Sequence, residues 1–243
     1  MIYKDIKLFS QNVQKNSLII KTILEVKTNF DIIFIQEPFW TTIHSILCSS
    51  NCKVESLVSV VNHPNWLIFT RPYTNEHKYP RVIIYIKIRL FSFHFSLWKD
   101  IIDHRNIILV LFFNNSNYFW LMNVYPDSLH TTLKYLKNIK VNIHNLLVIT
   151  RDFNIWDNLL DLSFPHHSSI SDNLIIIVVS FNLNLLCPIN QVPTRYFDNN
   201  NDSNSVIDLM FLWCSSTELN NYLIHSNWHL TFDHIFVSHH PYC

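Results

Sequence analysis

The sequence contains no glycine and no alanine among its 243 residues. Glycine is the residue that adopts positive φ most readily, so we expect turns that need positive φ to use asparagine or aspartate instead. Glycine and alanine codons both begin with G and carry G or C in second place. Their joint absence therefore suggests a gene driven strongly towards A and T, a hypothesis that a coding sequence of ordinary base composition would contradict.

Charge and long apolar runs are also scarce. The 18 basic and 18 acidic residues give a formal net charge of +0, so a nucleic-acid partner would have to be held by a local basic face. The five cysteines do not complete a paired zinc pattern. The longest apolar runs, such as 174–179, fall far short of the ~18 residues of a membrane span, and the N-terminus does not resemble a signal peptide. We therefore expect a soluble, intracellular protein without a membrane partner.

Hydrophobic residues make up 49% of the chain, which is enough to build a sizeable core, and we expect one domain over residues 1–243. Apolar positions at helical spacing predict helices over 17–27 and 171–181, capped by Ser17 and Ser171, and a third over 129–142. The segment 41–65 is polar and irregular, and its pattern does not allow an element to be placed there. This mixture indicates an α+β fold of packed sheets with outer helices. Apolar β-forming runs predict strands over 6–13, 31–36, 66–70, 81–88, 107–113, 118–125, 146–150, 205–213 and 235–238.

Acidic, amide, tyrosine and histidine side chains lie at the ends of these predicted strands. If the strands are neighbours, their ends converge at one rim, where a reactive site is commonly built. Asp208 differs from the others because it lies inside an apolar run, where an unpaired carboxylate is costly. The set comprises Asn12, Glu37, Asn123, Tyr125, Asp152, Asn154, Asp208, Asp233 and His234.

The oxygen donors of Glu37 and Asn12 suit Mg²⁺, with Mn²⁺ as the alternative, and leave the ion several of its waters. Asp233 could share or neighbour that metal. Asp152 could orient and deprotonate an attacking water, and Asn154 could donate to a phosphate oxygen.

A histidine, an acid and a hydroxyl complete this set. Pairing with Asp208 would hold His234 in one tautomer and favour the imidazolium beside a phosphate. Tyr125 adds a hydroxyl donor. Together these groups indicate metal-assisted hydrolysis of a phosphate ester.

Simpler interpretations stay open for individual members. Asn12 and Asn123 could be turn residues in a chain that must use asparagine for glycine. Glu37 could be a capping or surface acid, and Tyr125 could be a core residue whose hydroxyl reaches the surface. Asp152 and Asn154 could likewise form a turn in which their side chains hydrogen-bond to the backbone of the turn itself.

The order of the motifs resembles the endonuclease/exonuclease/phosphatase family, which includes DNase I. The motifs themselves are most similar to those of the endonuclease domain of fungal LINE-type (non-LTR) retrotransposons. This similarity extends over residues 6–238. The motifs are Gln11-Asn12-Val13, Ile35-Gln36-Glu37-Pro38, Asn123-Val124-Tyr125-Pro126-Asp127, Asp152-Phe153-Asn154, Ser205-Val206-Ile207-Asp208 and Asp233-His234.

This resemblance implies a four-layer α/β/β/α sandwich with the site at one rim of two sheets. It implies a divalent metal at Asn12 and Glu37, and no small-molecule cofactor. Asp152 would position the water, Asn154 would donate to the phosphate, and Asp208 and His234 would form the acid–histidine pair. Asp233 would assist the metal or the leaving group, while Thr194 and Asn123 would line the substrate site.

DNA is the partner that the resemblance implies. Loops near Arg71, Lys78 and Arg81 would grip it, and the nick would prime a reverse transcriptase, a domain that this chain lacks. Such a protein would act in the nucleus.

Two residues depart from the family's pattern. Arg151 stands where glycine usually precedes Asp-Phe-Asn, so it would either crowd the DNA or bind its phosphate. Phe232 replaces the serine before Asp-His. A decayed, inactive copy of the domain and a phosphomonoesterase of the same fold are therefore the alternatives to an active DNA endonuclease.

Overall fold

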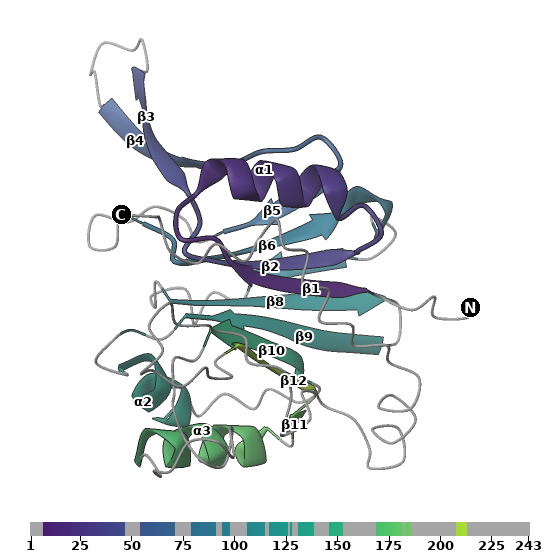
Figure 1. Ribbon diagram of the computed structural model, residues 1–243, viewed down its shortest axis with the longest axis vertical. Helices are drawn as coiled ribbons and strands as arrows, with labels where there is room; N and C mark the ends of the chain where they lie inside the picture. Colours follow the sequence, from purple (N-terminus) through teal and green to yellow (C-terminus); the bar gives the residue numbers. More distant parts are fainter. Residues whose placement is uncertain are drawn as a thin grey trace, which may run out of the picture.

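A computed structural model gives the arrangement of the chain (Figure 1). It describes residues 7–46, 54–70, 79–90, 94–97, 106–114, 117–125, 127, 131–138, 146–152, 169–181, 183–185 and 208–212. Some of these residues are described by their backbone alone, among them 146–152 and 208–212.

Two sheets pack face to face, and the first comes entirely from the N-terminal part of the chain. It consists of β1 (Leu8–Asn12), β2 (Ile32–Gln36), β6 (Val82–Lys87) and β5 (Trp66–Phe69), in that order. β1 runs parallel to β2, and the other pairings are antiparallel. Helix α1 (Ser17–Val26) connects β1 to β2 and covers the outer face of this sheet (Figure 1). A 3₁₀ turn, η1 (Ile88–Leu90), follows β6.

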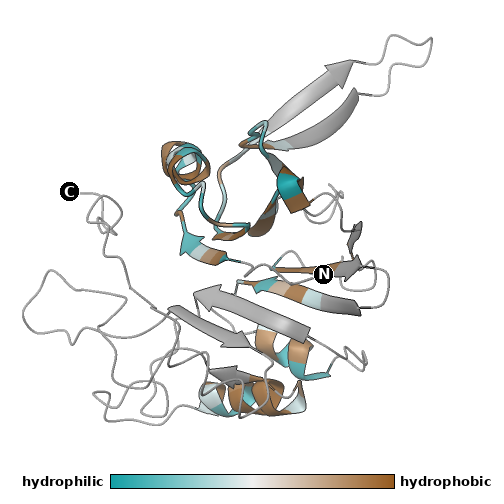
Figure 2. Ribbon diagram, turned by 90° about the vertical axis from the view of Figure 1, so that its right-hand side faces the viewer, coloured by the Kyte–Doolittle hydropathy of each residue, from teal (hydrophilic) through white to brown (hydrophobic). Residues whose placement is uncertain are grey.

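The second sheet has the order β11-β12-β10-β9-β8-β7. Its strands are β7 (His94–Leu97), β8 (Ile107–Asn114), β9 (Asn117–Val124), β10 (Leu146–Asp152), β11 (Asn184–Leu185) and β12 (Asp208–Leu212). Helices α2 (Thr131–Asn138) and α3 (Ser169–Ser180) lie on its outer face, on the opposite side of the molecule from α1 (Figure 2). The result is the four-layer α/β/β/α sandwich that the resemblance implies.

Alternation along the strands explains why both sheets are covered on both faces. In β2, Ile33 and Ile35 face α1, whereas Ile32 and Phe34 face the second sheet. A strand that is buried on both faces is apolar at successive positions, as Ile-Ile-Phe-Ile is here. The same alternation in β8 directs Ile108 towards the first sheet and its neighbours at 107 and 109 towards α2 and α3.

A two-stranded hairpin stands apart from these sheets. It joins β3 (Trp40–Ile46) to β4 (Val54–Val60) in antiparallel register and projects from the first sheet (Figure 1). The sequence pattern did not allow an element to be placed over 41–65, so these two strands were not predicted. β7 and β11 were also missed, and the predicted strand over 235–238 lies outside the described residues.

Both predicted helix caps were misplaced. Asn16 caps α1, because its side-chain oxygen accepts from the backbone N–H groups of Leu18 and Ile19 at 2.9 and 3.2 Å. Ser17 is already inside that helix. Ser171 lies inside the first turn of α3 and is fully buried there. Among the described helices none is long and apolar enough to cross a membrane.

The expected use of asparagine or aspartate at positive φ was also wrong for the described backbone. The residues with positive φ there are Gln14 (48°), Lys15 (60°) and Glu37 (46°). Each of them carries a Cβ in the left-handed region, which costs about 1–2 kcal/mol relative to right-handed backbone. All three lie at the same end of the first sheet, where β1 and β2 both finish.

Candidate active site

The register of the strands brings the predicted site residues of the first sheet to one rim. Asn12 ends β1 opposite Gln36, which ends β2, so Glu37 is the next residue beyond the sheet. Gln36 also pairs with Val82 at the start of the antiparallel β6. Arg81, just before that strand, therefore lies beside Glu37, and its carbonyl oxygen accepts the Glu37 N–H at 2.9 Å.

The second sheet supplies its residues to the same rim. β9 and β10 are parallel, with Asn123 opposite Thr150, so Tyr125 and Asp152 follow at the same end. β12 returns antiparallel, and its first residue, Asp208, is the register partner of Asp152. The backbone thus places two carboxylate-bearing residues side by side, as expected for a site at strand ends.

Glu37 joins the two sheets at this rim. Its Oε1 accepts a hydrogen bond from the Tyr125 hydroxyl at 2.7 Å and one from the Arg81 guanidinium at 3.0 Å. The guanidinium carbon lies 4.0 Å from the centre of the Tyr125 ring, which is a cation–π contact. Sequence reasoning counted Arg81 only among possible DNA contacts. Its pairing with Glu37 joins residues 44 positions apart, and no local pattern signals it.

Backbone strain accompanies this position. Glu37 adopts φ of 46°, and two hydrogen bonds hold it there. Its N–H donates to Arg81, and its carbonyl accepts from the Lys15 N–H at 2.7 Å. Residues held in sparsely populated backbone regions cluster at functional sites, where the surrounding structure fixes them.

Asn123 was expected to line the substrate site, but its side chain does not reach the rim. Its side chain is fully buried, 0% exposed. Its Nδ2 donates to the carbonyls of Ile35 and Ile83 at 3.0 and 2.8 Å, and its Oδ1 accepts from Gln36 Nε2 at 2.8 Å. Asn123 therefore reaches from the second sheet into the first and aligns the two. That is a positioning role, because a substrate has no access to the amide in this geometry.

A polar network beneath Tyr125 fixes its backbone. The Tyr125 N–H donates to the Asn106 carbonyl at 2.7 Å, and Asn106 Nδ2 donates to the Thr132 hydroxyl at 2.8 Å. Asp127 in turn accepts from the backbone N–H and the hydroxyl of Thr132, each at 2.9 Å, and from the Thr131 hydroxyl at 2.7 Å. Burial alone would raise the pKa of Asp127, but these hydrogen bonds hold that pKa well below its usual range.

The donors at this rim fit a hard cation such as Mg²⁺. Glu37 brings a carboxylate and Asn12 an amide oxygen from adjacent strands, and Mg²⁺ takes few protein ligands. Asn12 Oδ1 also accepts from the Gln14 N–H at 3.0 Å, so the turn role considered for it is present as well. In the part of the chain that the structure describes, no three His, Cys, Asp or Glu side chains group closely enough to form a metal site by themselves.

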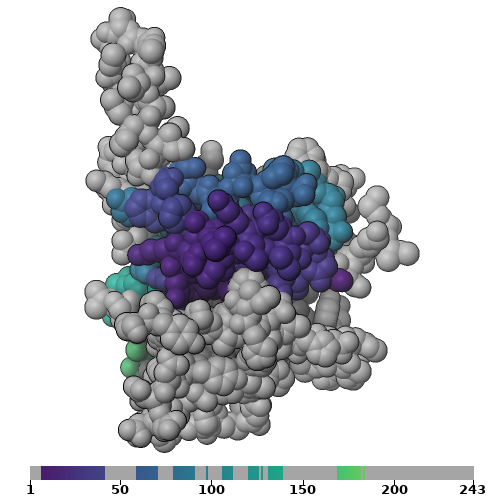
Figure 3. Space-filling view, turned by 45° about the horizontal axis from the view of Figure 1, so that its top comes forward, coloured from purple at the N-terminus to yellow at the C-terminus, as the bar shows by residue number. Residues whose placement is uncertain are grey.

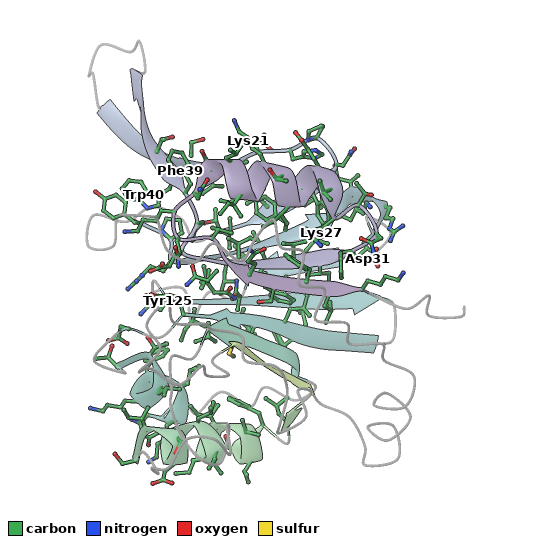
Figure 4. The ribbon with its side chains drawn as sticks, in the orientation of Figure 1. Lys21, Lys27, Asp31, Phe39, Trp40 and Tyr125 are labelled. Carbon is green, nitrogen blue, oxygen red and sulfur yellow. The ribbon has the colours of Figure 1, made fainter. Side chains whose placement is uncertain are left out.

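An aromatic pair that sequence reasoning missed lies at the same end of the molecule. The rings of Trp40 and Tyr79 stack with centroids 3.6 Å apart and planes 14° from parallel. Tyr79 is 41% exposed. Figure 4 shows Trp40 on the same side of the molecule as Tyr125, whereas Lys27 and Asp31 lie at the far end of the sheets.

Several predicted site residues cannot be placed. Asn154, Thr194, Asp233 and His234 lie outside the described residues, as do Arg71 and Lys78. Arg151 is described by its backbone, inside the ladder of β10 with Leu209 of β12.

No protein-family model matches the sequence, and no curated protein matches it. Solved structures do match the fold. One of them is the endonuclease domain of TRAS1, a telomere-specific non-LTR retrotransposon. The alignment covers 86% of this chain and 85% of the TRAS1 domain, with 14% sequence identity and a TM-score of 0.60. TDP2 of D. rerio, complexed with single-strand DNA product, aligns with 87% and 85% at 13% identity and a TM-score of 0.43. The match to the TRAS1 domain confirms, at the level of architecture, the resemblance noted in the motifs, and the chain has the DNase I-like fold.

Proposed function

We propose that this protein is a metal-dependent endonuclease that nicks DNA. The observation that carries the proposal is the convergence of Glu37, Tyr125, Asp152 and Asp208 from two sheets on one rim. Glu37 and Asn12 would hold Mg²⁺, which when bound supplies positive charge next to the phosphate. The strained backbone of Glu37 and the network beneath Tyr125 support this proposal, since both fix groups at the rim.

The chain's own residues divide the remaining work. Asp152 orients and deprotonates the attacking water, and Asp208 pairs with His234 and holds it in one tautomer. Asn154 donates to a phosphate oxygen, while the Tyr125 hydroxyl keeps the Glu37 carboxylate in place. Asp233 assists at the metal side. The Trp40–Tyr79 pair provides a flat apolar surface next to the site on which a base or sugar can rest.

A plasmid-nicking assay tests the proposal. The parent should convert supercoiled DNA to the open circle in Mg²⁺, and chelation should stop the reaction. Asp152→Ala and His234→Ala should each lower the rate at least about 100-fold, as expected for loss of a general base or acid. Glu25→Ala removes an exposed carboxylate from α1, remote from the rim, and should leave the rate unchanged. Equal rates in the parent and in both site variants would refute the proposal.

The second candidate is a folded or marginal relic that has lost catalysis or stability. Gln14 and Lys15 favour a loss of stability, because they hold positive φ in a chain without glycine. A sharp thermal transition together with no nicking would support this candidate. Hydrolysis of a soluble phosphomonoester in place of DNA would instead support a phosphatase of the same fold. If the nuclease is active, a retroelement origin and action in the nucleus remain proposals that an adjoining reverse-transcriptase reading frame would support.

A further inference from the structure

Arg81 and Tyr125 bond the same oxygen of Glu37 but differ in charge. The tyrosine donates a neutral hydroxyl, whereas the guanidinium neutralises the carboxylate. Both side chains of the ion pair are partly exposed, 28% for Arg81 and 19% for Glu37. The guanidinium is therefore close enough to solvent to move without opening the core.

A divalent cation bound to Glu37 would be repelled by the positive charge of this guanidinium. Mg²⁺ binds a carboxylate at roughly 2.0–2.1 Å, so both cations would lie within a few ångströms of one another on a single carboxylate. Such repulsion is screened less at a partly buried site than in open water. The ion pair with Arg81 and the binding of a cation therefore oppose each other.

Glu37 keeps its place when Arg81 moves. Its N–H and carbonyl are bonded to the backbone of Arg81 and Lys15, and neither bond depends on the guanidinium. The Tyr125 hydroxyl still holds Oε1. Removal of the Arg81 charge should thus leave the Glu37 carboxylate in the same orientation. The carboxylate should then attract cations more strongly.

We propose that Arg81 is an exchangeable counter-ion of Glu37. It neutralises the carboxylate while no metal is bound, and it turns to a phosphate of the substrate when a divalent cation takes its place. The planar fork of arginine suits phosphate oxygens as well as carboxylates. The metal assignment of Glu37 rests on the proposed function. By linkage, cation binding then strengthens phosphate binding through Arg81, and phosphate binding strengthens cation binding equally.

Cation binding in the absence of DNA tests the exchange. Mn²⁺ binding is followed by electron paramagnetic resonance, and Mg²⁺ competes for the site. Arg81→Met should bind Mn²⁺ about two- to fivefold more tightly than the parent, the range set by one partly exposed charge pair. Arg81→Lys keeps the charge and should stay near the parent value. Tyr125→Phe loses a neutral donor, so it should bind no more tightly than the parent.

Arg89→Met is the matched control. Arg89 follows β6 at its other end, where it pairs with the buried carboxylate of Asp31. The Arg89→Met substitution also removes one positive charge, but at the end of β6 that lies away from the rim. Unchanged Mn²⁺ affinity in Arg89→Met together with tighter binding in Arg81→Met supports the exchange. Equal or weaker binding in Arg81→Met overturns it.

The coupling has its own measurement, in which a fluorescent oligonucleotide is titrated with the protein in EDTA and in Ca²⁺, with strand integrity checked on a gel. Ca²⁺ should raise the parent's affinity for the oligonucleotide at least threefold more than it raises that of Arg81→Met. An equal gain in both overturns the phosphate role. Tighter Mn²⁺ binding by Arg81→Met without any nicking by the parent would refute the proposed function alone. Nicking with unchanged Mn²⁺ affinity would refute the exchange alone.

Discussion

Gln36 of the first sheet donates its side-chain amide to Asn123 of the second at 2.8 Å, inside the sandwich. Gln36 is 1% exposed and Asn123 is 0% exposed, so the bond is shielded from water. Towards the rim, Glu37 is the residue after Gln36, and Tyr125 lies two residues after Asn123. The buried amide pair therefore sets the alignment in which the rim residues meet.

Asn123→Ala should lower the free energy of unfolding by about 2–4 kcal/mol, because it leaves three buried partners without their bond. Those partners are the carbonyls of Ile35 and Ile83 and the amide of Gln36. Urea denaturation measures the change. Asn62→Ala, at an exposed position, should alter stability by less than about 0.5 kcal/mol. A loss as small for Asn123 as for Asn62 would show that the sheets align without this amide.

Asp127→Ala should cost about 1 kcal/mol at pH 7, the usual net value of a lost hydrogen bond, and the cost should shrink in acid. Hydrogen bonds from Thr131 and Thr132 lower the pKa of Asp127 below its unfolded value of about 4. A lowered folded pKa stabilises the protein above the unfolded pKa, and this contribution is lost as pH falls through the folded pKa. Denaturation of parent and variant at pH 7, 5 and 3 gives the difference. A difference that grows in acid would contradict the assignment.

Lys15→Gly should stabilise the protein by up to about 1 kcal/mol. Lys15 adopts φ of 60°, where glycine has no Cβ clash, although glycine also adds entropy to the unfolded chain. The same substitution at Lys21 provides the control. Lys21 lies exposed in α1, so Lys21→Gly should destabilise by about 1 kcal/mol. Thermal unfolding compares the two, and a loss of stability in Lys15→Gly would indicate that the Lys15 side chain contributes more than its backbone costs.

Trp40→Ala should weaken binding to a single-stranded oligonucleotide by about five- to tenfold or more, given about 1–3 kcal/mol for one base stacked on an aromatic ring. Tyr79→Ala should act in the same direction, because the two rings stack on each other. Fluorescence anisotropy in EDTA measures affinity without cleavage. Leu18→Ala removes an apolar side chain that is 69% exposed on α1 and should not change binding. Undiminished affinity in Trp40→Ala would remove this aromatic pair from the DNA-binding surface.

Much of the sandwich could be predicted because its strands are buried on both faces. In runs such as 32–35 and 107–110, successive apolar residues indicate burial on both faces. The hairpin of β3 and β4 could not be predicted in this way, since it forms a separate sheet and lacks the apolar signal of a layer between two others. The α1 cap was misplaced by one residue, because Asn16 and Ser17 are both good capping residues and only the backbone geometry separates them.

The convergence of strand ends on one rim was predictable. Asn12, Glu37, Tyr125 and Asp152 follow or end strands that meet there, and Asp208, which was expected inside a strand, is the first residue of β12. The partners of Glu37 were not predictable, since they come from residues 44 and 88 positions away in the sequence. Asn123 was assigned to substrate because it stands in a motif, but a motif does not reveal whether an amide points to the rim or into the neighbouring sheet. The assignments of His234, Asp233, Asn154 and Thr194, and of one domain over 1–243, stay predictions.

The division of the rim between two sheets also bears on synthesis. All strands of the first sheet and α1 lie within residues 7–90, and Figure 3 shows the coloured residues of this part, purple to blue, as one continuous surface. Arg81 therefore leaves the ribosome 44 residues before Tyr125, an interval of roughly a few seconds at ordinary elongation rates. Crosslinking of stalled nascent chains would show whether Glu37 and Arg81 pair in that interval. If they do, arginine is the first partner that the glutamate meets, and tyrosine joins a pair that already exists.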